Sequence, residues 1–378
     1  MSRTRPAGPE RTLTGAQALS WRLRRNALDP VAGSSVSDVA ERVLALRGWP
    51  AEVAELASCI RQEQPDPGAL SRALDDGELI RSYAFRGGSY VLSPGIAAVL
   101  LACRTASRVW ETPRYQQQGH FAIADWQPLR EAVHEALATG PATREEISAR
   151  LARVPALRHL SAAALGTGSD SLYKPLHWWG DICFGPSRDG QATFRILNGD
   201  PRWPGLPGID DAGPHAVALY LGSYGPATPA NLEYWLTEGL SVPRSRLASW
   251  IDGLGETLTS VSVDGVASYA LTADLAELDA AEPSEAVRLL PGFDPWVFAP
   301  GTADTRLLAP ARRTLATRGA QLAIKGGVVS GTWRLHRDEV VVTWFGEAGP
   351  PPPAALEREA ERLGRIRARH LSLTLTSG

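Results

Sequence analysis

Apolar residues recur at helical spacing in short runs near the start of the chain, and two alternating segments follow them. Val39, Val43 and Leu46 lie three or four positions apart, which predicts that they share one face of a helix. Three such helices are expected in succession, at residues 38–46, 52–61 and 68–75. A β-hairpin is expected next, from two short segments joined by Arg-Gly-Gly, 79–85 and 89–92. Three helices followed by a hairpin are typical of a winged helix-turn-helix module.

The phrase Gly-Pro-Ala-Thr occurs twice, at residues 140–143 and 225–228, each time between two segments with a helical pattern. Thr143 is followed three positions later by Glu146, a capping-box arrangement that marks the beginning of a helix. A pair of short strands is expected after each copy, at 181–185 with 191–196 and at 257–263 with 267–271. A repeated unit of this kind predicts tandem modules of the same plan.

The pattern changes after residue 285, where most segments are short and alternate in the manner of strands. Strands are expected at 287–290, 296–298, 322–324, 328–335, 340–345 and 372–375, with one helix at 353–367. Tight turns of Lys-Gly-Gly and His-Arg-Asp separate the middle strands. These features predict a small antiparallel β-domain that resembles a barrel.

Together the patterns predict an α+β fold of three tandem winged helix-turn-helix modules followed by a small antiparallel β-barrel-like domain. The expected divisions are a disordered tail at 1–13, winged helices at 14–110, 111–212 and 213–284, and the C-terminal β-domain at 285–378. Tandem modules in one chain remove the usual need for a dimer, so we expect a monomer.

Composition and charge narrow the class of protein. The chain has 378 residues and a net charge of −2, which does not fit a protein that coats nucleic acid non-specifically but allows a local basic stripe. The three cysteines, Cys59, Cys103 and Cys183, are far apart and show no metal-ligand spacing, so we expect neither a metal nor another cofactor. No apolar stretch has the length of a signal peptide core or a membrane span, which predicts a cytoplasmic protein without a membrane partner.

Basic residues near the predicted wings and the third recognition helix are candidate contacts to double-stranded DNA. They are Arg81 and Arg86 in the first module, Lys174 and Arg188 in the second, and Arg244 and Arg246 in the third. Such side chains usually bind phosphates and position the duplex. Any one of them could equally be a solvated surface residue, and the repetition of the pattern in every module favours DNA.

Several phrases spread over nearly the whole chain are similar to those of one enzyme family. They are Ile-Arg-Ser-Tyr-Ala-Phe-Arg-Gly-Gly at 80–88, Trp-Glu-Thr-Pro at 110–113, Leu-Tyr-Lys-Pro-Leu at 172–176, Trp-Gly-Asp-Ile-Cys-Phe-Gly-Pro at 179–186, Tyr-Gly-Pro-Ala-Thr at 224–228, Arg-Leu-Leu-Pro-Gly-Phe-Asp at 288–294 and Gly-Thr-Trp at 331–333. With them the chain resembles the AlkZ/YcaQ superfamily of winged-helix DNA glycosylases. The resemblance implies DNA repair by hydrolysis of the N-glycosidic bonds of alkylated purines, including bulky natural-product adducts and crosslinks. It also implies a role in antibiotic self-resistance for some members.

The sequence departs from this family at the expected catalytic motif, Gln-x-Gln or Gln-x-Asp before a helix with Ala-x-x-x-Arg. Counting back from Ala57 and Arg61 places that motif at residues 47–49, which read Arg-Gly-Trp. Three explanations stay open. The activity could be lost, it could depend on the nearby carboxylates Glu52 and Glu55, or the pocket could be rebuilt for an unusual adduct.

We therefore expect a monofunctional, metal-free glycosylase acting on bulky N7-alkylated purines, with a water oriented by Glu52 or Glu55. The expected pocket residues are Arg47, Trp49, His177 and Trp179, with Trp49 stacking on the adduct. Such a purine is already cationic, so it can leave without an acid, and the enzyme need only stabilise charge at C1′ and place a water. The alternative is a non-catalytic winged-helix regulator or adduct sensor, which the missing glutamines favour.

Overall fold

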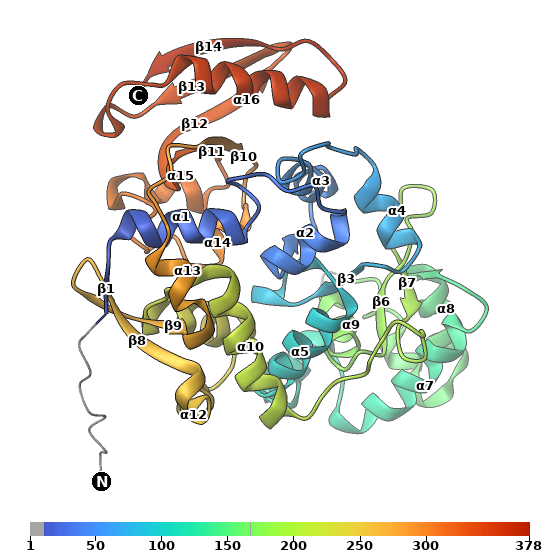
Figure 1. Cartoon of the computed structure of the whole chain (residues 1–378). Coiled ribbons are helices and arrows are strands. Elements are labelled where there is room, and N and C mark those ends of the chain that lie inside the picture. The colour runs from blue at the N-terminus through green and yellow to red at the C-terminus, as the bar shows by residue number, and fades with distance from the viewer. Residues whose placement is uncertain (1–10, 167) are drawn as a thin grey trace.

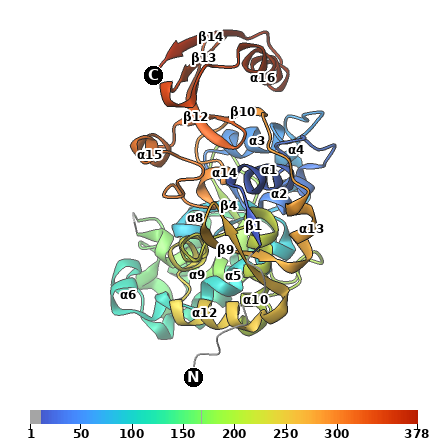
Figure 2. The ribbon, with the colours of Figure 1, turned by 60° about the vertical axis from the view of Figure 1, so that its left-hand side comes forward.

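The computed structural model describes residues 11–166 and 168–378 and shows a mixed α+β fold (Figures 1 and 2). Three units, each of helices followed by a hairpin, form the lower body in Figure 1, and a C-terminal sheet with one long helix lies above them. We call these the first, second and third helix–hairpin units and the C-terminal sheet. The α+β class expected from the sequence is confirmed.

The first unit contains three helices and a hairpin near the expected places. The first helix ends at Val43, and Leu46, which was expected to share its apolar face, lies on the strand β2. They are α2 (Val36–Val43), α3 (Ala51–Cys59), α4 (Ala69–Asp75), β3 (Ile80–Tyr83) and β4 (Ser89–Leu92). The two strands pair antiparallel. The N-cap of α4 is Gly68, with φ of +88°, and Asp66 just before it pairs with the side chain of Arg72. Glycine adopts this left-handed conformation without strain.

The second unit continues the sheet of the first. Its elements are α7 (Trp126–Leu137), α8 (Arg144–Arg153), α9 (Ser169–Trp178), β6 (Ile182–Phe184) and β7 (Thr193–Ile196). Thr143 caps α8 and forms the expected capping box with Glu146. Arg81 on β3 pairs with Phe184 on β6, so both hairpins belong to one six-stranded sheet. The short strands β2 (Leu46–Arg47) and β5 (Ala142–Thr143) form its edges.

The third unit begins with the long helix α10 (Ile209–Tyr224). Its other elements are α11 (Pro229–Leu232), the π-helical segment η5 (Glu233–Gly239), α12 (Arg244–Gly253), β8 (Leu258–Val263) and β9 (Val266–Leu271). Thr228 of the second Gly-Pro-Ala-Thr phrase caps α11. The strand β1 (Thr12–Leu13) pairs parallel with β8, so residues 11–13 are ordered, contrary to expectation. The remainder of the expected tail, residues 1–10, lies outside the described residues.

The C-terminal sheet has the strand order β10-β11-β12-β13-β14. Its elements are β10 (Val287–Leu290), β11 (Gln321–Lys325), β12 (Val328–His336), β13 (Glu339–Trp344), α16 (Pro353–Ile366) and β14 (Ser372–Ser377). The sheet is open, with β10 and β14 at its edges, so the expected barrel-like closure is not found. The expectation of an all-antiparallel sheet is also wrong, because α16 forms a crossover that returns the chain parallel to β13.

Residues 296–298 were expected to form a strand but belong to the short helix α14 (Pro295–Phe298). The Asp294 side chain accepts a hydrogen bond from the Trp296 backbone N–H, and Pro295 occupies the first helical position. A capping aspartate followed by proline favours the beginning of a helix. The apolar run therefore lies on a helical turn that packs beneath the C-terminal sheet.

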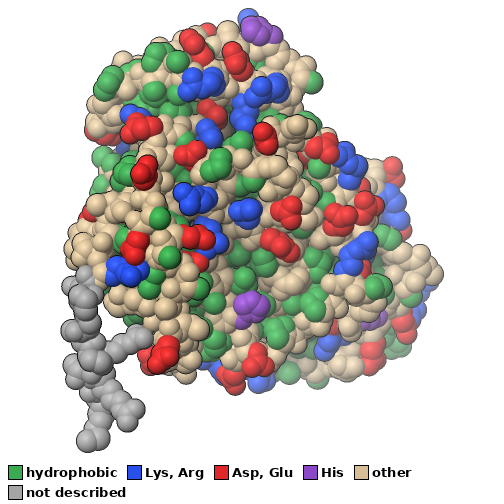
Figure 3. Space-filling view, in the orientation of Figure 1, with side chains coloured by type: hydrophobic (Ala, Val, Ile, Leu, Met, Phe, Trp, Pro, Cys, Tyr) green, Lys and Arg blue, Asp and Glu red, His purple; other side chains and the backbone are tan. Residues whose placement is uncertain are grey.

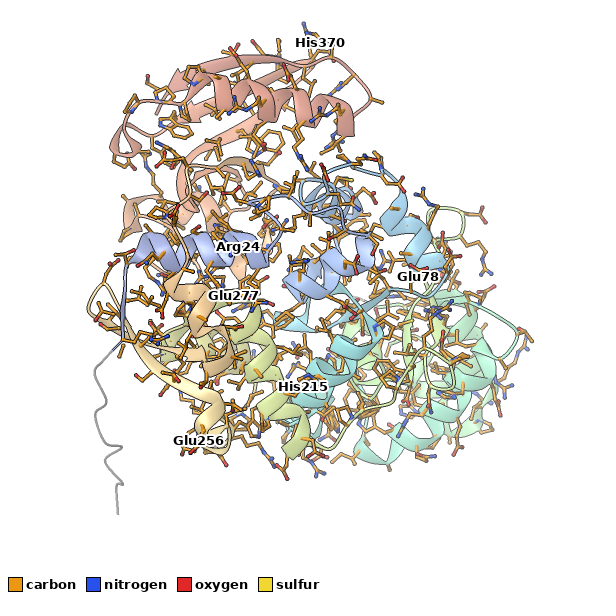
Figure 4. The ribbon with its side chains drawn as sticks, viewed as in Figure 1. Arg24, Glu78, His215, Glu256, Glu277 and His370 are labelled. Atoms are coloured by element: carbon orange, nitrogen blue, oxygen red, sulfur yellow. The ribbon has the colours of Figure 1, made fainter. Side chains whose placement is uncertain are left out.

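The first helix, α1 (Gly15–Arg25), joins the third unit to the C-terminal sheet. Leu19 and Leu23 are buried in the core of that sheet, whereas Trp21 is buried against β8 and β9. The Trp21 indole N–H donates to Glu277 on α13 (Leu275–Asp279), which Figure 4 labels. The helix α1 thus packs against elements from the second half of the chain.

Candidate DNA and adduct site

A hollow opens where the first unit, the third unit and the C-terminal segment meet. Two arginines and several aromatic rings line it: Arg47, Phe85, Arg86, Tyr90, Tyr234, Trp235, Phe293 and Phe298. Its walls come from β2, β4, the turn η1 (Phe85–Gly87), η5 and the segment around α14. The hollow therefore exists only when these distant parts of the chain are packed together.

Arg47 occupies one wall of the hollow at the end of β2. Its Nη1 donates to the Tyr90 hydroxyl at 3.3 Å, and its Nε donates to the backbone oxygen of Trp49 at 3.4 Å. The guanidinium carbon lies 5.6 Å from the ring centre of Tyr90 and 5.5 Å from that of Phe293. Stacking on two rings holds the guanidinium in place while leaving most of its N–H groups free to bind.

Arg86 occupies a second wall. Its backbone has a φ of +48° within η1, and its Nη2 donates to the backbone oxygen of Tyr234 at 2.9 Å. The guanidinium carbon lies 4.0 Å from the centre of the Tyr234 ring. Burial raises the pKa of Tyr234, so this phenol adds no negative charge at neutral pH. The ring belongs to the π-helical segment η5, and π-helical turns are frequent at functional sites.

Trp49 and Glu52 follow Arg47 closely in the chain, but neither is among the residues that line this hollow. Trp49 is 68% exposed, the largest exposure among the described large apolar side chains. Glu52 is also exposed and lies in the first turn of α3, where a carboxylate interacts favourably with the helix dipole. Both side chains are thus available to a ligand.

Glu55 lines a different hollow, between α3, α4 and the loop after β6. Its Oε1 accepts a hydrogen bond from the Gly68 backbone N–H at 2.7 Å. Arg81 lines the same hollow, with its guanidinium carbon 4.6 Å from the ring centre of Phe184. The structure therefore brings Glu55 together with Arg81, and Arg47 together with Arg86.

His177 and Trp179 are not among the residues that line the hollow at Arg47. His177 is fully buried beneath the hairpins, with its Nδ1 3.2 Å from the Ser82 hydroxyl oxygen. Trp179 packs edge-on against Trp110 and Trp126, with ring-centre distances of 5.3 and 5.0 Å. Packing within the first two units accounts for the positions of both rings.

We expect the buried His177 to make the protein less stable in mild acid. Burial lowers the pKa of His177 to about 3, whereas a histidine in the unfolded chain has a pKa of about 6.5. Between these values only the unfolded state binds the proton, so this contribution to stability is complete above about pH 6.5 and falls as the pH decreases. The expected loss is about 1.4 kcal/mol per pH unit.

Urea unfolding between about pH 7 and about pH 5 tests this expectation. The variant His177→Gln keeps a polar group at the position but cannot titrate, so its stability should fall less steeply over this range. Equal slopes for the wild type and the variant would contradict the assignment.

Four of the basic residues expected to contact DNA are paired with carboxylates. The pairs are Lys174 with Asp170, Arg188 with Glu146, Arg244 with Glu233, and Arg246 with Asp210. Acidic and basic side chains are interspersed over the face seen in Figure 3. Pairs near the surface are weak, so a DNA phosphate can replace the carboxylate at small cost.

Arg47, Arg81 and Arg86 differ from this group. Within residues 11–166 and 168–378, no carboxylate lies at ion-pair distance from any of the three. Their positive charges are therefore not neutralised by a neighbouring acid. Two of the three line the same aromatic hollow.

Sequence reasoning identified Arg47 and Arg86 but missed most of the aromatic lining. Phe85 and Phe293 lie within phrases that carry the family resemblance, so a signal for them was present. Tyr90 could have been found from its place in the strand facing residue 47. Nothing in the sequence pattern indicates that Tyr234 reaches this site from the third unit.

Comparison with known proteins places the chain in a family. A family model described as DNA glycosylase AlkZ-like matches residues 40–366. The chain belongs to the AlkZ-like DNA glycosylase family. It is 33% identical over 355 residues to the interstrand DNA cross-link repair glycosylase of Streptomyces sahachiroi, covering 92% of this chain and 95% of the relative.

A solved AlkZ-like structure shares the fold. The Streptomyces sahachiroi DNA glycosylase AlkZ superposes with a TM-score of 0.91 at 31% identity, covering 96% of this chain and 100% of the other. The expected family is thus confirmed over nearly the full length. Among the helices that the structure describes, none combines the length and apolar character needed to cross a bilayer.

Proposed function

We propose that this AlkZ-like protein is a DNA glycosylase that removes bulky N7-alkylated purines from double-stranded DNA, including crosslinked purines. The observation that carries the proposal is the aromatic hollow at Arg47. It is lined by Arg47, the first residue of the segment 47–49, where the family resemblance places the catalytic motif. The name of the Streptomyces sahachiroi relative, an interstrand cross-link repair glycosylase, supports the crosslink as substrate.

The reaction requires one water and no cofactor. The C1′–N9 bond of the cationic nucleotide breaks, and the bonding electrons leave with the purine, which becomes a neutral alkylated base. The water oxygen forms the new bond to C1′ and loses a proton to solvent. Since the departing base needs no protonation, the protein must stabilise the oxocarbenium-like charge and orient the water.

We assign these tasks to the segment after β2 and the first turn of α3. The exposed carboxylate of Glu52 is negatively charged and can orient the water and stabilise positive charge at C1′. The exposed Trp49 can stack on the purine, which is a usual way to hold an unstacked base. Glu55 is the weaker candidate because the Gly68 backbone N–H already occupies one of its oxygens.

The three helix–hairpin units are proposed as winged-helix modules that hold the duplex. In this arrangement four basic side chains exchange their carboxylate partners for DNA phosphates: Lys174, Arg188, Arg244 and Arg246. Arg81 and Arg86 lie near the two joined hairpins. We propose that the protein works as a monomer in the cytoplasm, in the repair of alkylation damage or in self-resistance to a genotoxin.

A base-release assay tests the proposal. The substrates are a duplex with one bulky N7-guanine adduct and a matched N7-methylguanine duplex. We expect the wild type to release the bulky base and Glu52→Gln to release it roughly 10²–10⁴-fold more slowly. Glu256→Gln, which changes an exposed glutamate on η6 (Gly255–Thr257), serves as the matched control and should behave like the wild type.

The outcome of this assay distinguishes the role of Glu52 from the glycosylase activity as a whole. Equal release by wild type and Glu52→Gln would keep the enzyme and reject Glu52 as the catalytic group. No release from either duplex by the wild type would reject the glycosylase proposal.

The second candidate is a non-catalytic adduct sensor or regulator. It is favoured by the chemistry of the hollow at Arg47, because no carboxylate or amide side chain is among its described lining residues. A sensor would bind the adducted duplex with an affinity that falls as salt rises, and it would release no base.

A further inference from the structure

We infer that the hollow at Glu55 binds the Watson–Crick edge of an unpaired cytosine, the base that faces the alkylated guanine in the duplex. The identity of this occupant rests on the proposed function. A protein that displaces a guanine from the helix leaves the partner base without its hydrogen bonds, which costs free energy. A second site that restores these hydrogen bonds stabilises the opened pair.

The helical walls of the hollow at Glu55 offer hydrogen-bond acceptors. The Oε1 of Glu55 accepts from the Gly68 backbone N–H at 2.7 Å, whereas none of the described residues donates a hydrogen bond to its Oε2. Asp75, an exposed residue of α4, lines the same hollow and adds a second carboxylate. The side formed by α3 and α4 therefore favours a ligand group that donates, such as an amine.

Arg81 on β3 offers donors from a different wall. Its guanidinium carbon lies 4.6 Å from the ring centre of Phe184, and burial lowers the pKa of Arg81 with no carboxylate contributing to the shift. Glu55 and Arg81 thus line one hollow without forming an ion pair in the described part of the chain. The space between them suits a ligand with a donor at one end and acceptors at the other.

Cytosine carries its polar groups in this order. The amine at its C4 can donate to the free oxygen of Glu55, while its unprotonated N3 and its C2 carbonyl accept from two N–H groups of Arg81. Guanine fits less well because its N1–H and its amine require two adjacent acceptors, and the Gly68 N–H occupies one oxygen of Glu55. Uracil and thymine present a carbonyl to the carboxylate and an N–H to the guanidinium, so both contacts are unfavourable.

The remaining walls suit a pyrimidine ring and lie where DNA is proposed to bind. Leu70, Leu74 and Pro186 give the hollow apolar surface. Two of its walls are α4, the third helix of the first unit, and the loop that follows β6 in the second unit. The third helix of a helix-turn-helix module is the element that enters a groove of the duplex.

The hollow at Glu55 lies close to the hollow at Arg47, across the six-stranded sheet. Leu46 and Arg81 both pair with Val91, so β2 and β3 are two strand spacings apart, about 10 Å. Successive residues of a strand point to opposite faces, which places the side chains of Arg47 and Arg81 on opposite faces of the sheet. The two hollows can therefore receive groups that separate from one another.

One short segment connects the two hollows. Arg47 lines the first hollow and Ala51 lines the second, and the exposed Trp49 lies between them in the chain. A guanine stacked on Trp49 and a cytosine bound at Glu55 would thus lie on either side of this segment. The arrangement keeps the two bases of the opened pair from closing again.

Two duplexes that differ only in the unpaired base test the inference. Each carries a tetrahydrofuran analogue of an abasic site, opposite cytosine in one duplex and opposite uracil in the other. Fluorescence anisotropy at fixed salt measures the affinity of the full chain for each. We expect the wild type to bind the cytosine duplex at least roughly tenfold more tightly, because uracil opposes donor to donor and acceptor to acceptor.

Two variants assign the preference to the hollow. Glu55→Gln keeps an oxygen for the Gly68 N–H and places an amide N–H group at the free position, so we expect the preference for cytosine to be lost. Arg81→Met should weaken binding of the cytosine duplex by roughly tenfold, since it removes two hydrogen bonds to the base. Glu78→Gln changes an exposed glutamate outside the hollow, labelled in Figure 4, and should keep the preference of the wild type.

Equal affinity of the wild type for the two duplexes, or tighter binding of the uracil duplex, would overturn the inference. A preference for cytosine that persists unchanged in both Glu55→Gln and Arg81→Met would overturn it as well. Thermal unfolding of both variants shows whether they are folded, and the comparison of the two duplexes by the wild type does not depend on them.

The base-release assay distinguishes the role of this hollow from the proposed function, because the anisotropy measurement requires no base release. Release of an N7-alkylated base by a protein without a preference for cytosine would overturn only the role of the hollow at Glu55. A preference that depends on Glu55, in a protein that releases no base, would overturn only the glycosylase proposal.

Discussion

Replacing Asp294 by alanine is expected to lower the free energy of unfolding by about 3–5 kcal/mol, because it would leave a buried cation without a partner. Arg61 and Asp294 are 0% and 1% exposed, and two hydrogen bonds of 2.9 and 2.7 Å join them. Asp294 also caps α14 through the Trp296 backbone N–H. Urea unfolding of the variant and the wild type measures the loss.

A double variant tests whether the loss of stability comes from leaving the Arg61 charge unpaired. Arg61→Met combined with Asp294→Leu removes both charges with apolar side chains, and we expect it to regain much of the stability that Asp294→Ala loses. If the double variant were less stable than Asp294→Ala, the hydrogen bonds of Arg61 to the Asn26 and Ala57 carbonyls would contribute more to stability than the ion pair does. A loss below about 1 kcal/mol for Asp294→Ala would contradict the assignment.

Replacing Trp49 by alanine is expected to weaken binding to a duplex with a bulky N7-guanine adduct by about 1–3 kcal/mol, the usual contribution of one aromatic ring stacked on a base. The ring is 68% exposed, so its removal should change the stability of the free protein little. Fluorescence anisotropy at fixed salt measures the affinity, and thermal unfolding measures the stability.

Ile123→Ala is a suitable control for this variant. Ile123 is 53% exposed, lies on η3 (Ile123–Asp125) and is not among the residues that line the hollow. The control should bind DNA as the wild type does. If Trp49→Ala also bound the adducted duplex normally, Trp49 would have no part in recognising the adduct.

Local signals predicted much of the fold because they act over a few residues. Thr143 and Glu146 marked the beginning of α8, and their capping box is present there. The prediction of a strand at residues 296–298 was wrong because a short apolar run fits a buried helical turn as well as a strand.

Long-range pairing could not be predicted in the same way. The parallel partner of β14 depends on the path of the chain around α16, and no short pattern encodes it. The site shows the same limit. Arg47 was found by counting along one segment, whereas Tyr234 reaches it from the third unit through tertiary packing.

The packing of α1 has a consequence for the order of events during synthesis. Leu19 and Leu23 are synthesised before the three units, but they are covered by the core that includes β10 and β11, which is synthesised after those units. Domains generally fold as they emerge, so the first helix must wait with its apolar face uncovered while the three units form. Docking of α1 on the C-terminal sheet can therefore occur only after that sheet has been synthesised.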